Sequence, residues 1–296
     1  MNGPNRAGDS QGEGALADSR SIPPPFRETI QERVRAVDLV LLIGPAVLLV
    51  WVFSLPTALR YTLVFDPAQP SLRTAFSANY VHLTWLHLLS NVAGYLLLAS
   101  VVYLLAVING TRRRFQTVVM GILLVFPVPL SYLDLVLDLP GIVLGFSGLN
   151  MALLGYGIVE ISVYIRNYVT DRFDVENAPG FFFATTTFVG AMYAETTVGF
   201  VFLGASALIA LFYWIEILLS IEFLIVGSKQ ILDHPGYVEL LAGGILLSAG
   251  FVLAAFPADP VYHSSVVNIY LHFAGFAMGF ISTYTWVTLG RYVRSE

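Results

Sequence analysis

The stretch Gly145-Phe-Ser-Gly-Leu-Asn-Met-Ala-Leu-Leu-Gly-Tyr156 opens a segment that stays largely apolar to residue 165, with Glu160 as its single charged residue. A helix of roughly 20 such residues crosses the hydrocarbon core of a bilayer. Seven other apolar segments make the fold class an all-α polytopic membrane protein of eight helices. The eight predicted helices lie near residues 38–59, 82–108, 117–137, 147–165, 180–195, 198–226, 237–257 and 268–290.

The composition agrees with this fold class. The 296 residues are 56% hydrophobic and 12% charged, with a mean hydropathy of +0.74, whereas a soluble domain carries about 25% charged residues. A soluble enzyme and a nucleic-acid-binding protein are therefore excluded. The sequence has no cysteine, which excludes disulfides, a thiol nucleophile and a cysteine metal site.

Basic residues indicate how the helices are oriented, because they gather at the cytoplasmic ends of membrane helices. If the short segment 180–195 spans, these clusters all fall on one side: Arg33 and Arg35, Arg112 to Arg114, Arg166 and Arg172, Lys229, Arg291 and Arg294. We therefore expect a multi-pass protein of the cell membrane with both termini in the cytosol. Residues 1–36, rich in Gly, Ser, Pro and charge, are predicted to be a disordered cytosolic tail, and residues 37–296 the membrane domain.

Polar residues inside membrane helices are expensive to bury, so they indicate functional sites. His87 and Asn91 are four residues apart and share one face of the second helix. Ser147 begins the fourth helix, and His272 begins the last, followed by Gly275 and Gly279. All three helices are predicted to run from outside to inside, which places these groups at similar depths near the outer face.

This set of side chains permits nucleophilic acyl transfer. A serine hydroxyl becomes a nucleophile when a neighbouring neutral histidine accepts its proton, here Ser147 and His272. The Asn91 amide, a His87 ring N–H and the backbone N–H groups at the start of the Ser147 helix can stabilise an oxyanion. Small residues such as Gly148 allow this helix to approach the Gly275 and Gly279 stripe closely.

The ordered motifs H-x4-H-x3-N (from residue 82), G-x-S-G (from residue 145) and H-x2-G-x3-G (from residue 272) resemble those of the rhomboid intramembrane serine proteases. The resemblance covers 38–165 and 268–290. It implies a Ser147–His272 dyad, with His87 and Asn91 at the oxyanion and a structural role for His82. It also implies a six-helix core with two added helices within 180–257. The substrates would be transmembrane segments of other proteins, reached from the outer face and cleaved in the lipid bilayer without metal or cofactor.

The sequence departs from the family pattern at two positions next to the dyad. Met151 stands one turn after the nucleophile, where a tyrosine often stacks on the imidazole, and Leu271 replaces a small residue before His272. Gly145 and Gly148 keep the pattern.

Two alternative functions remain. The first is a catalytically silent rhomboid relative that binds membrane proteins, for which Met151 and Leu271 leave room. The second is a transporter that uses Glu216 and Glu222, but the sequence lacks the internal repeat typical of transporters. Glu160 is expected to extend toward the cytosol, as long charged side chains near helix ends do.

Overall fold

A computed structural model describes residues 24–137, 141–170, 173–219, 234–259, 261–262 and 265–295. Helices form nearly all of it. The long helices are α2 (Leu39–Ser54), α5 (Trp85–Ile108), α6 (Arg112–Leu124), α7 (Pro127–Val136), α8 (Ser147–Tyr164), α9 (Ala178–Tyr193), α10 (Thr197–Leu219), α12 (Tyr237–Ala255) and α13 (Ile269–Ser295). The short helices are α1 (Phe26–Arg33), η1 (Ala36–Asp38), α3 (Thr57–Tyr61), α4 (Leu72–Ser77), η2 (Ala78–Tyr80), η3 (Ile165–Val169) and η4 (Val175–Asn177). Strands β1 (Val261–Tyr262) and β2 (Ser265–Val266) pair as a small antiparallel ribbon.

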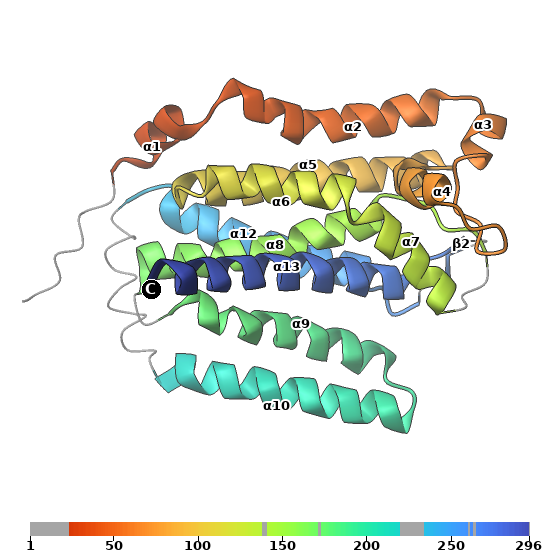
Figure 1. The fold of residues 1–296 in the computed structure, drawn as a ribbon. Coiled ribbons are helices and arrows are strands. Elements are labelled where there is room, and N and C mark those ends of the chain that lie inside the picture. The colour runs from red at the N-terminus through yellow and green to blue at the C-terminus, as the bar shows by residue number, and fades with distance from the viewer. Residues whose placement is uncertain are drawn as a thin grey trace, which may run out of the picture.

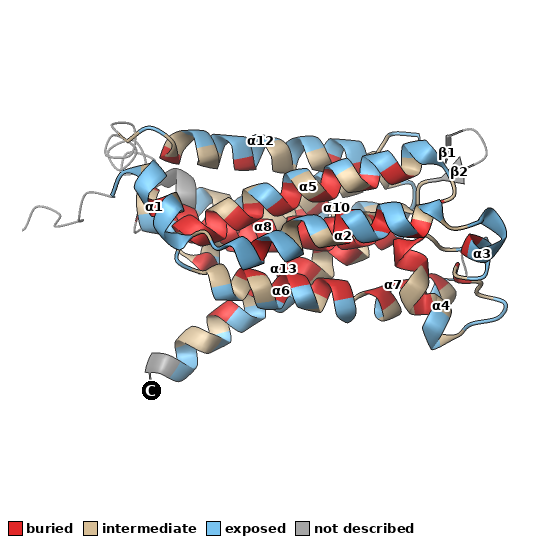
Figure 2. Cartoon of the chain, turned by 90° about the horizontal axis from the view of Figure 1, so that it is seen from above, coloured by how far each residue is buried: buried red, intermediate tan, exposed pale blue. Residues whose placement is uncertain are grey.

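The long helices lie side by side along one axis (Figure 1). The helix α1 and the end of α13 lie at one end of the bundle, and α3, α4 and the β-ribbon lie at the other in both views (Figures 1 and 2). The first residues of α8 and of α13 therefore lie near the end that carries α3 and α4.

The helices are long and apolar enough for a membrane protein of several spans. Within the described residues, five of them meet this criterion by length and composition, and the bent pair α6–α7 makes a sixth if it counts as one span. Helices α2 and α12 are exposed along much of their length (Figure 2), and their exposed side chains include the apolar Val47, Trp51 and Leu246. The predicted all-α, multi-helix membrane character is thus confirmed at this level, and the orientation in the membrane stays a prediction.

The third predicted helix, 117–137, begins earlier than expected and is broken. Helix α6 starts at Arg112, and α7 starts at Pro127 after a bend of 45°. Proline has no N–H to donate and its ring clashes with the preceding turn, so it starts a helix more readily than it continues one.

Helix α8 is the centre of the bundle, because every residue of its apolar window is buried. Its main partner is α13, and glycines on both helices make that approach possible. A Cβ on Gly275 would overlap the carbonyl oxygen of Gly148, and a Cβ on Gly279 would overlap that of Ala152. The two backbones are therefore in direct contact.

The segment between α8 and α13 divides into two parts. Helices α9 and α10 form a hairpin that packs mainly on itself, and α9 also contacts α8 and α13. Helix α12 instead packs against α5 and α8. The hairpin is peripheral, as Figure 1 shows at the lower edge of the bundle, whereas α12 belongs to the central group.

The end of the bundle that carries α1 gathers basic side chains and their partners. The Arg112 guanidinium donates to both carboxylate oxygens of Asp38, at 2.6 and 3.0 Å. Arg166 and Arg291 both pair with Asp174. This agrees with the one-sided distribution of arginine in the sequence. Arg172, Glu222 and Lys229 lie outside the described residues.

Part of the segment expected to be a tail contacts the bundle. Residues 26–33 form α1, whose Arg33 side chain donates to the carbonyl of Ile108 at 2.7 Å. The Phe26 ring stands edge-on to Tyr237 with centroids 5.3 Å apart. An aromatic side chain and a basic side chain thus attach α1 to the ends of α5 and α12. Residues 1–23 lie outside the described part.

The prediction for Glu160 was wrong, because its side chain is 0% exposed and does not reach solvent. Its carboxylate accepts hydrogen bonds from Arg114, Tyr156, Asn109 and Thr111 at 2.8–2.9 Å. A buried carboxylate needs such partners to offset its lost hydration. Arg114 extends inward to supply the opposite charge, so the helices α6 and α8 are connected through an ion pair.

Candidate functional site

Ser147 is the first residue of α8, and Gly145, two residues before it, sets the direction in which the chain enters this helix. Gly145 has φ = +110°, a conformation that favours glycine, and its N–H donates to the carbonyl of Ala78 at 3.0 Å. A Cβ on Gly145 would lie 2.6 Å from Cε1 of His87. Gly145 therefore gives the chain its turn into α8 and leaves room for the His87 ring.

His272 lies in the first turn of α13 and is 8% exposed. Its Nδ1 lies 2.8 Å from the carbonyl oxygen of Ala255, the last residue of α12. The ring of Phe256 stands edge-on to the imidazole, with centroids 6.1 Å apart. The helix itself is fixed at its start by Asn268, whose Oδ1 accepts the Leu271 N–H at 3.1 Å.

Ser147 and His272 stand beside a direct backbone contact between α8 and α13. Gly148, next to Ser147, meets Gly275 through its carbonyl, and a Cβ on Gly148 would lie 3.6 Å from the carbonyl oxygen of Leu271. The structure thus brings the two helices together at the level of the predicted dyad. Within the described part of the chain no hydrogen bond joins the two side chains, and catalytic hydrogen bonds often tighten only when substrate binds.

His82, which precedes α5, and His87 of α5 lie near the start of α8. The rings of His82 and His87 stand edge-on, with centroids 4.8 Å apart. His82 Nε2 accepts the N–H of Phe146 at 3.4 Å, and the His82 carbonyl accepts from Arg60 at 2.6 Å. His82 therefore connects Arg60 of α3 to Phe146, the residue before Ser147. A structural role for His82 stays a prediction.

Asn91 is 4% exposed and takes part in a chain of hydrogen bonds. Its side-chain Nδ2 donates to the carbonyl of His87 at 2.9 Å, and its own carbonyl accepts from Asn150 Nδ2 at 3.0 Å. One hydrogen of the Asn91 amide group is used in this way, and an amide group has two. The Asn150 contact joins α5 to α8 one turn below Ser147.

Two groups of the candidate site, the Asn150 side chain and the Ala255 carbonyl, were not identified from the sequence. Asn150 is a polar residue in an apolar helix, which is a signal of function that the sequence does contain. The carbonyl of Ala255 has no such signal, because every residue has a carbonyl. Met151 is fully buried beside Ser147, and Gly279 lies two turns after His272 in the contact with α8.

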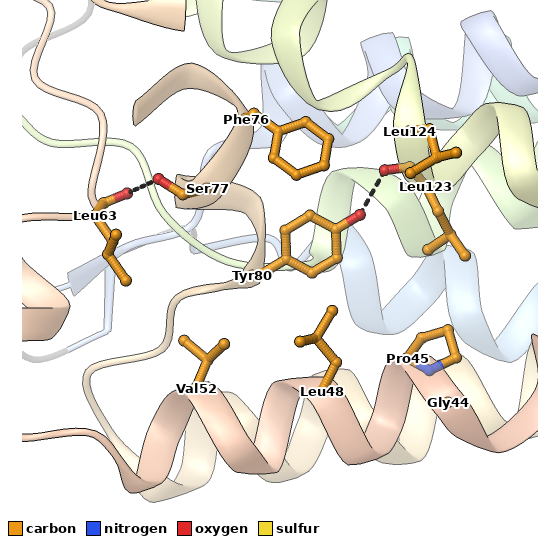
Figure 3. A pocket seen from close by; sticks show the side chains of 10 residues that line it. All are labelled: Gly44, Pro45, Leu48, Val52, Leu63, Phe76, Ser77, Tyr80, Leu123 and Leu124. Atoms are coloured by element: carbon orange, nitrogen blue, oxygen red, sulfur yellow. Dashed lines mark hydrogen bonds between the residues drawn. The ribbon is translucent and has the colours of Figure 1, made fainter. Parts of the chain in front are cut away.

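An apolar pocket of about 320 Å³ lies between α2, η2 and α6 (Figure 3). Its two polar side chains are already engaged: the Tyr80 hydroxyl donates to the carbonyl of Leu123, and Ser77 Oγ donates to that of Leu63 at 2.7 Å. The pocket therefore offers no free polar side chain for catalysis. On its far side the Tyr80 ring packs against Phe146, with centroids 5.6 Å apart.

No metal centre is found among the described residues, which contain no group of three His, Asp or Glu placed to hold an ion. Glu216 lies in α10, a helix of the peripheral hairpin. The proposed partner of Glu216 in a transport pathway, Glu222, lies outside the described residues.

Comparison of the chain with protein-family models, with curated proteins and with solved structures gave no match.

Proposed function

We propose that the chain is an intramembrane serine endopeptidase of the rhomboid type, which cleaves transmembrane segments of other membrane proteins. The observation that carries the proposal is the direct backbone contact of α8 and α13 beside Ser147 and His272. The His87 ring, which lies next to Gly145, adds a third polar side chain near the start of α8. The motifs that resemble the rhomboid family come from helices α5, α8 and α13, and these are brought together at one end.

In the proposed reaction, Ser147 Oγ attacks the scissile carbonyl carbon while His272 accepts the hydroxyl proton. The carbon–oxygen bond forms, and the carbonyl oxygen becomes an oxyanion. When the carbon–nitrogen bond breaks, His272 returns the proton to the leaving amine. Water then attacks the acyl-enzyme with the same base, which releases the carboxylic acid and restores Ser147.

Donors for the oxyanion are available at the start of α8. The N–H groups of Gly145 and Phe146 are used by Ala78 and His82. Those of Ser147 and Gly148 belong to the first turn, where a helix has no carbonyl to accept them. Together with the second hydrogen of Asn91 and a ring N–H of His87, they form the proposed oxyanion site.

The proposed orientation places α1 and the C-terminus in the cytosol and the site near the outer face. The gathering of basic residues around Asp38 and Asp174 at the opposite end supports it. Water for the hydrolytic step would then enter from the outer face.

The proposal is tested with a fluorophosphonate probe and a model transmembrane substrate, using protein purified in detergent. Wild-type protein is expected to react at Ser147, while Ser147→Ala and His272→Ala each lose both labelling and cleavage. The double variant is expected to be little worse than either single variant, because residues that act as a unit are not additive. A folded wild-type protein that neither reacts nor cleaves would refute the proposal and favour a silent binding protein.

A further inference from the structure

The carbonyl of Ala255 is free to bind a side chain because it lies at the end of α12. The last four carbonyls of a helix have no partner within the helix. The Ala255 oxygen accepts from His272 Nδ1 at 2.8 Å. A carbonyl oxygen can only accept a hydrogen bond, so Nδ1 must carry the hydrogen.

We propose that the end of α12 is the positioning element of the dyad: the Ala255 carbonyl holds His272 in the Nδ1–H tautomer, and Tyr193 of the α9–α10 hairpin holds that end of α12. This inference rests on the proposed function, because it assigns a role to the groups around His272, the proposed general base. Neutral His272 then has its lone pair on Nε2, the nitrogen left to accept the Ser147 proton. A buried acid does this orienting work in serine protease triads, and here a backbone carbonyl does it.

Three contacts fix the end of α12. Phe256 follows Ala255 and is fully buried, with its ring edge-on to His272. The Phe256 N–H donates to the carbonyl of Val252 at 3.0 Å, which keeps the last turn closed. The Tyr193 hydroxyl donates to the carbonyl of Pro257, immediately after the turn. The position of the Ala255 oxygen is therefore set by contacts from two other helices.

The hairpin also contacts α13 directly. Phe182 of α9 stacks on Phe276 and on Phe280 of α13, with interplanar angles of 9° and 17°. The hairpin thus contacts both helices that are joined by the hydrogen bond between His272 Nδ1 and the Ala255 oxygen. It contacts α13 through Phe182 and the end of α12 through Tyr193. This gives the peripheral pair of helices a function in the reaction, although neither helix contributes a residue to the dyad.

The tautomer is measured by ¹⁵N NMR of histidine-labelled protein, with the His272 signals assigned by their loss in His272→Ala. The protonated and unprotonated ring nitrogens resonate far apart, so the two tautomers are distinguished directly. We expect a single Nδ1–H form in the wild-type protein at neutral pH. An Nε2–H form, or a mixture of the two, would overturn the role of Ala255.

The hairpin contact is tested with Tyr193→Phe, which removes one hydroxyl and keeps the ring. Loss of this hydrogen bond is expected to slow labelling of Ser147 by about 2- to 10-fold and to produce a second His272 tautomer in the spectrum. A merely stabilising role would lower the unfolding temperature without changing the tautomer. The matched control is Tyr61→Phe, at an exposed tyrosine of α3, which should change neither.

The outcomes separate this inference from the proposed function. Wild-type labelling and a single tautomer in Tyr193→Phe would refute the role of the hairpin. A clear Nδ1–H tautomer in a wild-type protein that does not react with the probe would refute the protease and leave the α12 contact standing.

Discussion

Replacing Gly279 with alanine tests whether the contact of α8 and α13 sets the geometry of the proposed Ser147–His272 dyad. The residue lies two turns from His272, so the added methyl group does not touch the reacting groups. Its Cβ would lie 2.7 Å from Cα of Ala152 and would overlap the carbonyl oxygen of the same residue. Carbon atoms in contact stand about 3.5–4.0 Å apart, so the two helices must separate by about 1 Å.

We expect Gly279→Ala to lose much of the labelling rate and only a moderate part of the free energy of unfolding. A displacement of about 1 Å in a catalytic arrangement can lower the rate about 100-fold, whereas overpacking a core costs about 1–3 kcal/mol. We therefore expect Gly279→Ala to remain folded and to label at Ser147 about two orders of magnitude more slowly. The assay is the labelling rate, measured together with the thermal unfolding midpoint in the same detergent.

The same helix supplies the control. A Cβ on Gly290 of α13 would meet nothing within 4 Å, so Gly290→Ala should label at the wild-type rate. If Gly279→Ala reacts as fast as the control and unfolds at the same temperature, the helix contact does not position the dyad and the reasoning fails.

Three further predictions concern the oxyanion, the topology and the pH dependence of stability. Asn91→Ala should lower turnover by about 10²–10³ while slow labelling of Ser147 persists; full activity in a folded variant would remove Asn91 from the oxyanion site. Cysteine placed at Ser71 should react with an impermeant maleimide in intact cells and cysteine at Ser10 should not; the reverse pattern would invert the proposed topology. Burial by itself raises the pKa of Asp174, but hydrogen bonds from Arg291 and the Val175 N–H hold that pKa below its ordinary value. Its stabilisation is thus present above the unfolded pKa of about 3.9 and is lost as the pH falls through the lower folded pKa. The unfolding midpoint of wild type should therefore exceed that of Asp174→Asn at pH 7, with the gap closing below about pH 4; a gap independent of pH would contradict the ion pair.

The sequence predicted best those helices that follow from a long apolar run and do not depend on a particular neighbouring helix. The apolar runs near 38–59 and 82–108 correspond to α2 and α5, because a long apolar segment can satisfy its backbone hydrogen bonds within itself only as a helix. Helix α2 forms although it contains Pro45. The segments 180–195 and 237–257 correspond to α9 and α12 within a few residues. The break before Pro127 is also encoded locally, although the apolar run 117–137 predicts one helix.

The close approach of α8 and α13 was partly visible in the sequence. Glycines at 148, 275 and 279 indicated small surfaces on two helices. Which glycine meets which carbonyl depends on the rotation and register of both helices, and a pattern on one helix does not contain that information. The structure pairs Gly275 with Gly148 and Gly279 with Ala152.

The sequence by itself determined the class of protein and most of its long helices, because these depend on composition and local spacing. The tertiary structure alone decided which partners those side chains have. It placed Glu160 against Arg114 and the Ala255 carbonyl against His272. The physical reason is that a buried ion pair or a backbone acceptor acts across helices 17 to 46 residues apart in the chain, and only packing brings such groups together.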